Sequence, residues 1–387
     1  MGVTAGPRPE EMDDLGVPEH PGSHEEFVAD PYAHYRLLRT AGGSVQRAHS
    51  GGRLLVLGHR ECAAALRDRR LRHPLERVNV GGDQFRRMVH PMFTPAAVAA
   101  RRRRIDDEVA RLLAGAPRGP AAFEVVEGLA RPLTLAVIGD LLGLPEADRH
   151  RLAAAPSVLS GAIDPDRIDP AALELAGLFG ELFEARRAEP ADDLVSHMIR
   201  YVGGDHRPWA ESLARGCHVL LRAGYDATAH AVGNLVLALG RHPGGRKFLG
   251  GHPDRIPAAV QEVLRYDPPV QIVGRVAAEA LDIGGARVAA GETVLLVLAA
   301  ANRDPEWLPA PDVLDVGRSE AELAGQLAFG GGGHFCLGAA LARAQAAAVM
   351  SALCRGPVQL AGTSASAPVY RPGFPIRGLA ELHVVLR

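Results

Sequence analysis

Lysine is almost absent from this chain of 387 residues. Its 43 lysines and arginines include a single lysine, Lys247. The preference for arginine, together with abundant alanine, glycine and proline, reflects a GC-rich genome and carries no functional information. The basic residues are balanced by 45 aspartates and glutamates, which leaves a net charge of −2. This balance gives no reason to expect nucleic acid or an anionic membrane as a partner.

Cysteine is also scarce, with Cys62, Cys217, Cys336 and Cys354 and no CxxC spacing among them. The spacing speaks against the usual zinc motifs and redox dithiols. Four isolated cysteines in a chain of this length do not form a disulfide framework either. We therefore expect a reducing, cytoplasmic location.

Long apolar runs and targeting signals are missing as well. No stretch of eighteen apolar residues occurs, so the sequence predicts no membrane-spanning helix. Residues 1–24 lack the basic-then-apolar pattern of a secretory signal. We expect an irregular lead-in over residues 1–24 and one domain over residues 25–387.

The hydrophobic residues make up 47% of the chain, which is enough for a large core. Their period is helical from about residue 30 to 260. The predicted helices cover 32–41, 58–67, 94–114, 123–142, 170–187, 208–241 and 254–266. Short strand-like runs cover 53–57, 281–283, 293–298, 369–370 and 382–386. The sequence thus predicts a mainly α fold with small β-sheets, the last two runs closing a small C-terminal sheet.

The segment 208–241 is unusual in its length and in its apolar middle. As one helix it would be about 50 Å long, and apolar or small residues occupy nearly every face of its middle. A helix that is apolar all round is buried, so we expect this one to cross the centre of the molecule. Asp226 is the exception, because burying an isolated carboxylate is expensive.

Cys336 stands where a glycine-rich loop leads into an alanine-rich helix. The first amides of a helix carry partial positive charge, so a cysteine at that junction is expected to have a lowered pKa. The loop is not a phosphate loop, because His334 follows Gly333 where that motif needs lysine. It is not a dinucleotide-binding motif either, because Phe335 and Cys336 stand where that motif needs glycine. Local residues alone fit an incidental cysteine in a turn equally well.

The longer run 329–338, Phe-Gly-x-Gly-x-His-x-Cys-Leu-Gly, resembles the heme-binding signature of cytochrome P-450 enzymes. The resemblance covers about residues 25–387 and implies a single-domain fold with a long central helix and heme b, iron protoporphyrin IX, as cofactor. It makes the Cys336 thiolate the axial ligand of heme iron, a ligand that favours O–O cleavage. It places His334 on a heme propionate and four residues against the porphyrin: Phe329, Gly330, Leu337 and Gly338.

Glu262 and Arg265 resemble the family's ExxR pair, which is buried and helps to hold the cysteine loop. Outside that context an i, i+3 pair is usually a solvated salt bridge. The basic residue that the family often has in the segment before the loop is replaced by Val313, and Arg318 is the candidate to compensate.

Two arginines, Arg86 and Arg275, resemble the family's propionate-binding arginines. The histidine expected four residues before Arg86 is Gly82, so that contact is expected to be lost. The alternative interpretation of either arginine is an ordinary surface cation.

The run 223–228, Ala-Gly-Tyr-Asp-Ala-Thr, resembles the family's A-G-x-[DE]-T-[TS] pattern but has Ala227 at the threonine position. The resemblance places Ala223 and Gly224 against heme and makes Asp226 a proton relay; the alternative for Asp226 is pairing with a nearby arginine. Thr228 lies about 100° further round the helix and does not simply substitute. We hypothesise that a substrate hydroxyl or an ordered water supplies the missing hydrogen bond, or that the reaction is not plain hydroxylation.

The resemblance lines the substrate pocket with Val270, Ile272 and Val273, and with parts of 73–83, 157–163, 220–228 and 373–376. These are mostly apolar, which favours an apolar or aromatic substrate. The implied function is oxidation of a small organic molecule with O₂ and electrons from a separate ferredoxin- or reductase-type donor, in the tailoring of a secondary metabolite. The alternatives are a heme-thiolate catalyst of oxidative coupling, cyclisation or rearrangement, and a non-catalytic heme sensor, against which Asp226 argues.

Overall fold

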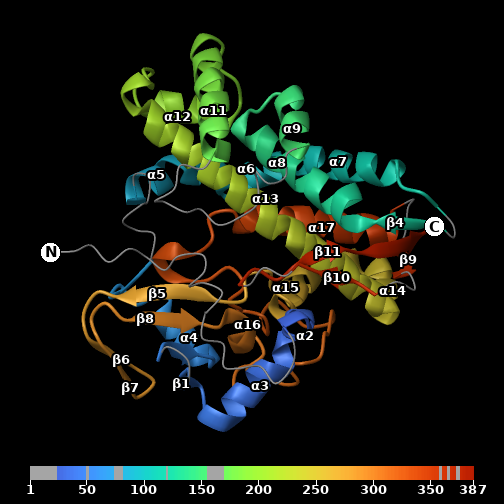
Figure 1. Cartoon of the computed structure of the whole chain (residues 1–387). Coiled ribbons are helices and arrows are strands. Elements are labelled where there is room, and N and C mark those ends of the chain that lie inside the picture. Colours follow the sequence, from blue (N-terminus) through green and yellow to red (C-terminus); the bar gives the residue numbers. More distant parts are fainter. Residues whose placement is uncertain are drawn as a thin grey trace.

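The computed structural model describes residues 24–48, 52–73, 82–118, 121–154, 170–356, 360–363, 367–371 and 375–387. The expected lead-in lies outside this part, apart from His24. The fold is mainly helical with small sheets, as the sequence predicts (Figure 1). The α-helices of the described part are α2 (His24–Ala29), α3 (Pro31–Gly42), α4 (His59–Ala65), α5 (Gly82–Val89), α6 (Pro95–Ala100), α7 (Arg102–Ala114), α8 (Arg131–Leu142), α9 (Glu146–Ala153), α11 (Pro170–Ala188), α12 (Leu194–Tyr201), α13 (Ala210–Arg241), α14 (Pro243–Gly251), α15 (Ile256–Tyr266), α16 (Leu298–Ala301) and α17 (Ala339–Arg355).

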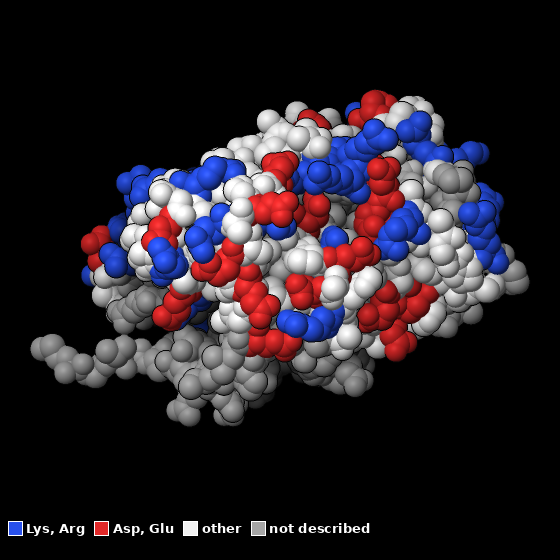
Figure 2. Space-filling model, turned by 90° about the horizontal axis from the view of Figure 1, so that it is seen from above, with Lys and Arg blue, Asp and Glu red and all other residues white. Residues whose placement is uncertain are grey.

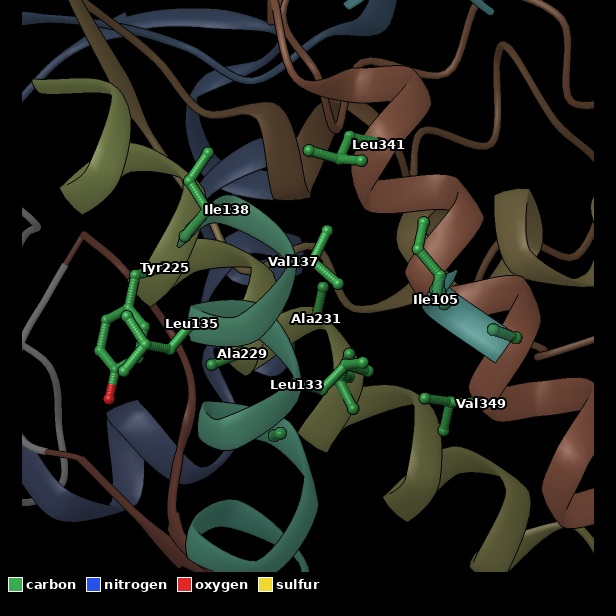
Figure 3. Close-up of a cluster of buried hydrophobic side chains, with 14 of the residues drawn as sticks. Ile105, Leu133, Leu135, Val137, Ile138, Tyr225, Ala229, Ala231, Leu341 and Val349 are labelled. Atoms are coloured by element: carbon green, nitrogen blue, oxygen red, sulfur yellow. The ribbon is translucent and has the colours of Figure 1, made fainter. Parts of the chain in front are cut away.

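The predicted central helix is α13, whose 32 residues run diagonally through the middle of the molecule (Figure 1). Its buried face packs against α8, and Figure 3 shows Leu135 and Ile138 of α8 beside Tyr225 and Ala229 of α13. Close packing requires a glycine at position 224, because a Cβ there would lie 2.9 Å from the Ile138 side chain. The apolar stretch of the sequence therefore forms the centre of the core.

The sheets are small, as expected, and lie beside the helical body. The strands are β1 (Val45–Arg47), β2 (Leu54–Val56), β3 (Leu71–Arg72), β4 (Ala122–Glu124), β5 (Val273–Ala277), β6 (Leu281–Ile283), β7 (Ala286–Val288), β8 (Thr293–Leu296), β9 (Leu360–Thr363), β10 (Val369–Tyr370), β11 (Leu379–Glu381) and β12 (His383–Leu386). The largest sheet has the order β1-β2-β8-β5-β3. It joins segments far apart in sequence, since β2 pairs in parallel with β8 and β3 pairs antiparallel with β5.

Three element predictions need correction. Residues 94–114 form two helices, because α6 ends at Ala100 and α7 begins at Arg102. The segment 123–142 begins with β4 and a π-helical stretch, Val126–Ala130, before α8 starts. The two C-terminal runs do not share a sheet, since β10 pairs with β11 while β12 pairs with β4 and β9.

Charged side chains of both signs are interleaved on the face seen from above (Figure 2). Residues 101–104, four consecutive arginines at the start of α7, follow this pattern. Arg102 pairs with Asp106 at 2.9 Å and Arg104 with Asp140 at 3.2 Å, while Arg101 is buried. The run is thus a solvated, charge-paired face and not a concentrated basic patch. None of the helices in the described ranges is long and apolar enough to cross a membrane.

Candidate active site

The cysteine loop runs from Leu327 to Gly338 and is shaped by its own backbone. The amide of Cys336 donates to the Phe329 carbonyl at 2.9 Å, and the amide of Gly330 donates to the Leu327 carbonyl at 2.9 Å. A short 3₁₀ turn, Gly332–His334, forms the tip of the loop. These bonds fold the loop back on itself, so that Cys336 faces the same cavity as Phe329.

Gly332 is the loop residue for which a side chain is least tolerable. Its φ is +63°, in the left-handed region that favours glycine. A Cβ at this position would also lie 2.2 Å from the backbone carbonyl oxygen of Leu66. The loop therefore presses against the end of α4, and only glycine permits that approach.

The expected pKa of Cys336 needs correction. Helix α17 begins at Ala339 with Gly338 as its N-cap, so Cys336 lies outside the first turn. Desolvation by the surrounding groups raises the pKa of the Cys336 thiol above its ordinary value, and this effect outweighs the Gly338 amide and the nearby Arg86 and Arg343, which act in the opposite direction.

A cavity of about 310 Å³ separates the cysteine loop and α17 from α13. It brings together many of the residues that the sequence singles out. These are Ala223, Gly224, Ala227, Thr228, Val270, Val273, Arg275, Phe329, Gly330, His334, Cys336, Leu337 and Gly338. The wall is otherwise mostly apolar and includes Phe93, Ile138, Leu220 and Leu341.

Glu262 and Arg265 of α15 are fully buried and form a two-pronged ion pair, with nitrogen–oxygen distances of 2.6 and 2.8 Å. Arg265 also donates to the carbonyl oxygen of Asn302 at 3.0 Å. The side-chain oxygen of Asn302 in turn accepts from the amide of Leu327 at 2.6 Å. The pair is thus connected through Asn302 to the start of the cysteine loop.

Arg318 is the candidate to compensate for Val313. It is buried, and its Nε lies 3.4 Å from Glu262. Val313 is exposed and contributes only its carbonyl oxygen, which accepts from Arg265 at 3.1 Å. The arginine five residues later thus supplies the charge that Val313 lacks.

Asp226 does not line the cavity. Its carboxylate lies 2.9 Å from Nη1 of Arg371 and 3.5 Å from Nε2 of His230, one helical turn further along α13. Burial alone would raise the pKa of Asp226, but His230 and Arg371 more than offset it and hold the pKa at about 2. Arginine pairing, the alternative interpretation of this acid, is therefore realised in the fold, although the sequence does not indicate Arg371 as the partner.

Ala227 and Thr228 both face the cavity. Thr228 is buried, and a hydroxyl therefore reaches the same space from a neighbouring position on the helix. The methyl group of Ala227 leaves the usual threonine site apolar.

The two predicted propionate arginines are placed differently. Arg275 is buried in β5 and lines the cavity. Arg86 of α5 instead donates to the Phe335 carbonyl oxygen, which braces the outer side of the cysteine loop. His73, the first residue of the expected pocket segment 73–83, lines the cavity after β3, with its ring centroid 5.6 Å from that of His334.

One expected pocket residue is misplaced. Ile272 is buried away from the cavity, in a cluster with Tyr32 and Val297, because its side chain lies on the other side of the segment from Val273. The expected pocket segments 157–163, 74–81 and 373–374 lie outside the described residues.

Comparisons with known proteins identify the family. Residues 256–355 match the family model "Cytochrome P450" (cytochrome P-450). The chain is 34% identical to the cytochrome P-450 monooxygenase PikC of Streptomyces venezuelae over 99% of its length and 96% of that protein. It is 35% identical to the 6-deoxyerythronolide B hydroxylase of Saccharopolyspora erythraea over 78% of its length and 75% of the relative.

A solved structure, that of the cytochrome P-450 BioI in complex with acyl carrier protein carrying hexadec-9Z-enoic acid, matches with a TM-score of 0.82. The two are 31% identical, and the match covers 95% of this chain and 100% of the other. The fold, with the Cys336 loop facing a long central helix across a cavity, is that of the cytochrome P-450 proteins. The chain belongs to the cytochrome P-450 family and is a monooxygenase with heme as its cofactor.

The residues present fit that cofactor. Cys336 lines the cavity, and a Cβ added at Gly330 or Gly338 would meet no atom within 4 Å, so a flat ring can approach the backbone there. Among the described residues, no group of three or more His, Cys, Asp or Glu side chains gathers to hold a metal ion. Iron would then be held by the porphyrin and by Cys336.

Proposed function

We propose that Cys336 is the axial ligand of heme iron and that the chain, over residues 25–387, is one catalytic domain that oxidises a small, largely apolar organic molecule. The observation that carries this proposal is the cavity between the Cys336 loop and the Ala227–Thr228 turn of α13. When bound there, thiolate-ligated heme supplies the activation of dioxygen. The protein's own residues supply the pocket, its apolar wall and the hydrogen bonds at its edge.

The apolar lining of the cavity indicates the class of substrate. Leu220, Val270 and Val273 present apolar side chains to the cavity, and Thr228 adds a single hydroxyl. Such a wall selects by shape and apolar contact, with few polar groups to fix orientation. We infer tailoring of a secondary metabolite in the cytoplasm; the hydroxylase and monooxygenase names of the relatives support the oxidation itself.

Ala227 supports a second candidate, a heme-thiolate catalyst of oxidative coupling, cyclisation or rearrangement. A threonine hydroxyl is missing where the family places one, while Thr228 faces the cavity from the next position. Hydroxylation then relies on a hydroxyl of the substrate or on an ordered water. A sensor without turnover is less well supported, because the relatives that the chain matches are named as a monooxygenase and a hydroxylase.

Electrons come from a separate donor, and we propose that it docks beside the cysteine loop. Phe335 is exposed there, and Arg86 braces its carbonyl oxygen. Arg67, next to Gly332, and Arg87, next to Arg86, are exposed. These cations fit a donor with an acidic surface.

The test of turnover combines the heme-loaded protein, O₂, a ferredoxin with its reductase and a panel of apolar compounds. We expect substrate-dependent electron consumption with an oxidised product. Charge reversal by Arg87→Glu should slow the first electron transfer several-fold at low salt, whereas the control Arg187→Glu on α11 should not. Ligand binding without any product would favour the sensor. Equal rates of first electron transfer for the two variants would contradict the proposed docking site.

A further inference from the structure

We propose that His73 binds a carboxylate of the bound porphyrin and thereby replaces the histidine that Gly82 lacks. This inference rests on the proposed function, because it assumes heme in the cavity. It concerns a residue outside the motifs that define the family's heme site. It also explains how a chain without the usual histidine still neutralises an anionic edge of the cofactor.

The position of His73 follows from strand pairing. Leu71 pairs with Ala277 and Arg72 pairs with Val276 in the antiparallel ladder of β3 and β5. Continuing that register by one residue places His73 opposite Arg275, which lies in β5. The strand end thus delivers the imidazole to the same stretch of wall as the buried guanidinium.

A second contact comes from the cysteine loop. The ring centroids of His73 and His334 lie 5.6 Å apart with their planes tilted by 41°. Both rings line the cavity, as does Arg275. Three nitrogen-bearing side chains from β3, β5 and the cysteine loop therefore converge on one region.

The chemistry of this region selects an anion. The described residues that line the cavity include His73, His334 and Arg275 but no aspartate or glutamate. An arginine and two imidazoles without a carboxylate among the described lining residues favour a negatively charged group, and charge-assisted hydrogen bonds are the strongest that such donors make. The porphyrin brings two carboxylates, whereas the rest of the wall is mostly apolar.

The usual donors on the α5 side are not among the described residues that line the cavity. Position 82 is a glycine at the start of α5, and Arg86 does not line the cavity but donates to the Phe335 carbonyl oxygen. His73 reaches the cavity from β3 instead. The donor has therefore moved from the helix to the strand that precedes it.

The experiment measures the rate at which heme leaves the ferric protein for an excess of apomyoglobin. We expect His73→Ala to release heme about tenfold faster, the effect of roughly 1.4 kcal/mol, and His73→Gln, which keeps a donor, to stay near wild type. The control His150→Ala removes an exposed histidine of α9 and should change nothing. Reconstitution with heme dimethyl ester, which has no carboxylate, should abolish the difference between wild type and His73→Ala.

The outcomes separate this inference from the proposed function. If wild type and His73→Ala release heme at the same rate while both keep the thiolate spectrum, His73 does not bind the carboxylate. A difference that persists with the dimethyl ester would assign His73 a structural role and would also overturn the inference. If wild type binds no heme through Cys336, the proposed function itself fails.

Discussion

The carboxylate of Asp226 and the guanidinium of Arg371 lie 2.9 Å apart, although 145 residues separate them in the chain. The pair joins the middle of the central helix to the segment after β10. His230 lies beside both groups, 3.0 Å from Arg371 and 3.5 Å from Asp226. The acid expected to relay protons is therefore held by an ion pair behind the cavity wall.

This pair makes stability depend on pH. The pKa of Asp226 is lowered to about 2 in the folded protein from an ordinary value of 3.8. A lowered carboxyl pKa stabilises the fold above the unfolded-state pKa, and that contribution disappears as pH falls through the folded-state pKa. We expect Arg371→Met to lower the free energy of unfolding by about 2 kcal/mol at pH 5–7, with the gap to wild type narrowing below about pH 4.

Urea unfolding at several pH values measures that gap. The reference background is Asp226→Asn, in which Arg371 has no carboxylate to pair with. In that background Arg371→Met should lower the free energy of unfolding by less, and the effect should not depend on pH in the same way. A gap that is constant from pH 7 down to about pH 2 in the wild-type background would show that Arg371 acts through packing alone.

Breaking the Glu262–Arg265 pair should lower the free energy of unfolding far more than breaking a surface ion pair does. Both side chains are fully buried, so removing one partner leaves an uncompensated charge, at a cost of about 3–5 kcal/mol. We expect Arg265→Met to yield little heme-loaded protein and a much lower unfolding midpoint. Arg187→Met breaks an exposed pair with Glu184 and should change stability by less than about 1 kcal/mol; similar effects of the two substitutions would contradict the structural role.

Two neighbouring glycines provide a matched test of the cysteine loop. Gly332→Ala should distort the loop, because it forces a Cβ against the Leu66 carbonyl oxygen at a positive φ. Gly333→Ala has open space around its Cβ and should be tolerated. Heme content and the absorption spectrum of the two purified variants check this, and equal heme content would show that the loop adapts without the glycine.

Ala227→Thr tests whether the missing hydroxyl sets the chemistry. Ala227 lines the cavity, so the added hydroxyl enters the space where the substrate or a water is expected to supply that hydrogen bond. We expect the ratio of product formed to electrons consumed to change with the native substrate. Thr228→Val removes the neighbouring hydroxyl at similar volume and serves as the comparison. If Ala227→Thr leaves both the product and the ratio of product to electrons consumed unchanged, Ala227 has no special role.

The sequence predicts the central helix for a physical reason, because the apolar period around Leu220–Val232 marks burial. The cavity residues Cys336, Leu337 and Gly338 are instead predicted from the resemblance to the heme-binding signature, since local residues alone leave the cysteine ambiguous. Local pattern therefore suffices for one long helix but not for a site.

The misses arise where distant segments meet. Arg371 carries no motif, and only the return of the chain after β10 brings it to Asp226. His73 begins the expected pocket segment 73–83, but its place beside Arg275 follows from the pairing of β3 with β5, which no local pattern indicates. The helix-start argument for a lowered Cys336 pKa fails because the helix begins three residues later and desolvation raises that pKa. Ile272 was misplaced because the side chains of neighbouring residues there point in different directions.

The most direct test of the central claim is the absorption spectrum of the reduced, CO-bound protein. With Cys336 as the thiolate ligand, the Soret band should be strongly shifted to the red, and Cys336→Ala should lose that band. Cys354→Ala, a substitution at a cysteine of α17 that does not line the cavity, should keep it. A folded, heme-loaded wild type without the red-shifted band, or a Cys336→Ala variant that retains it, would contradict the account.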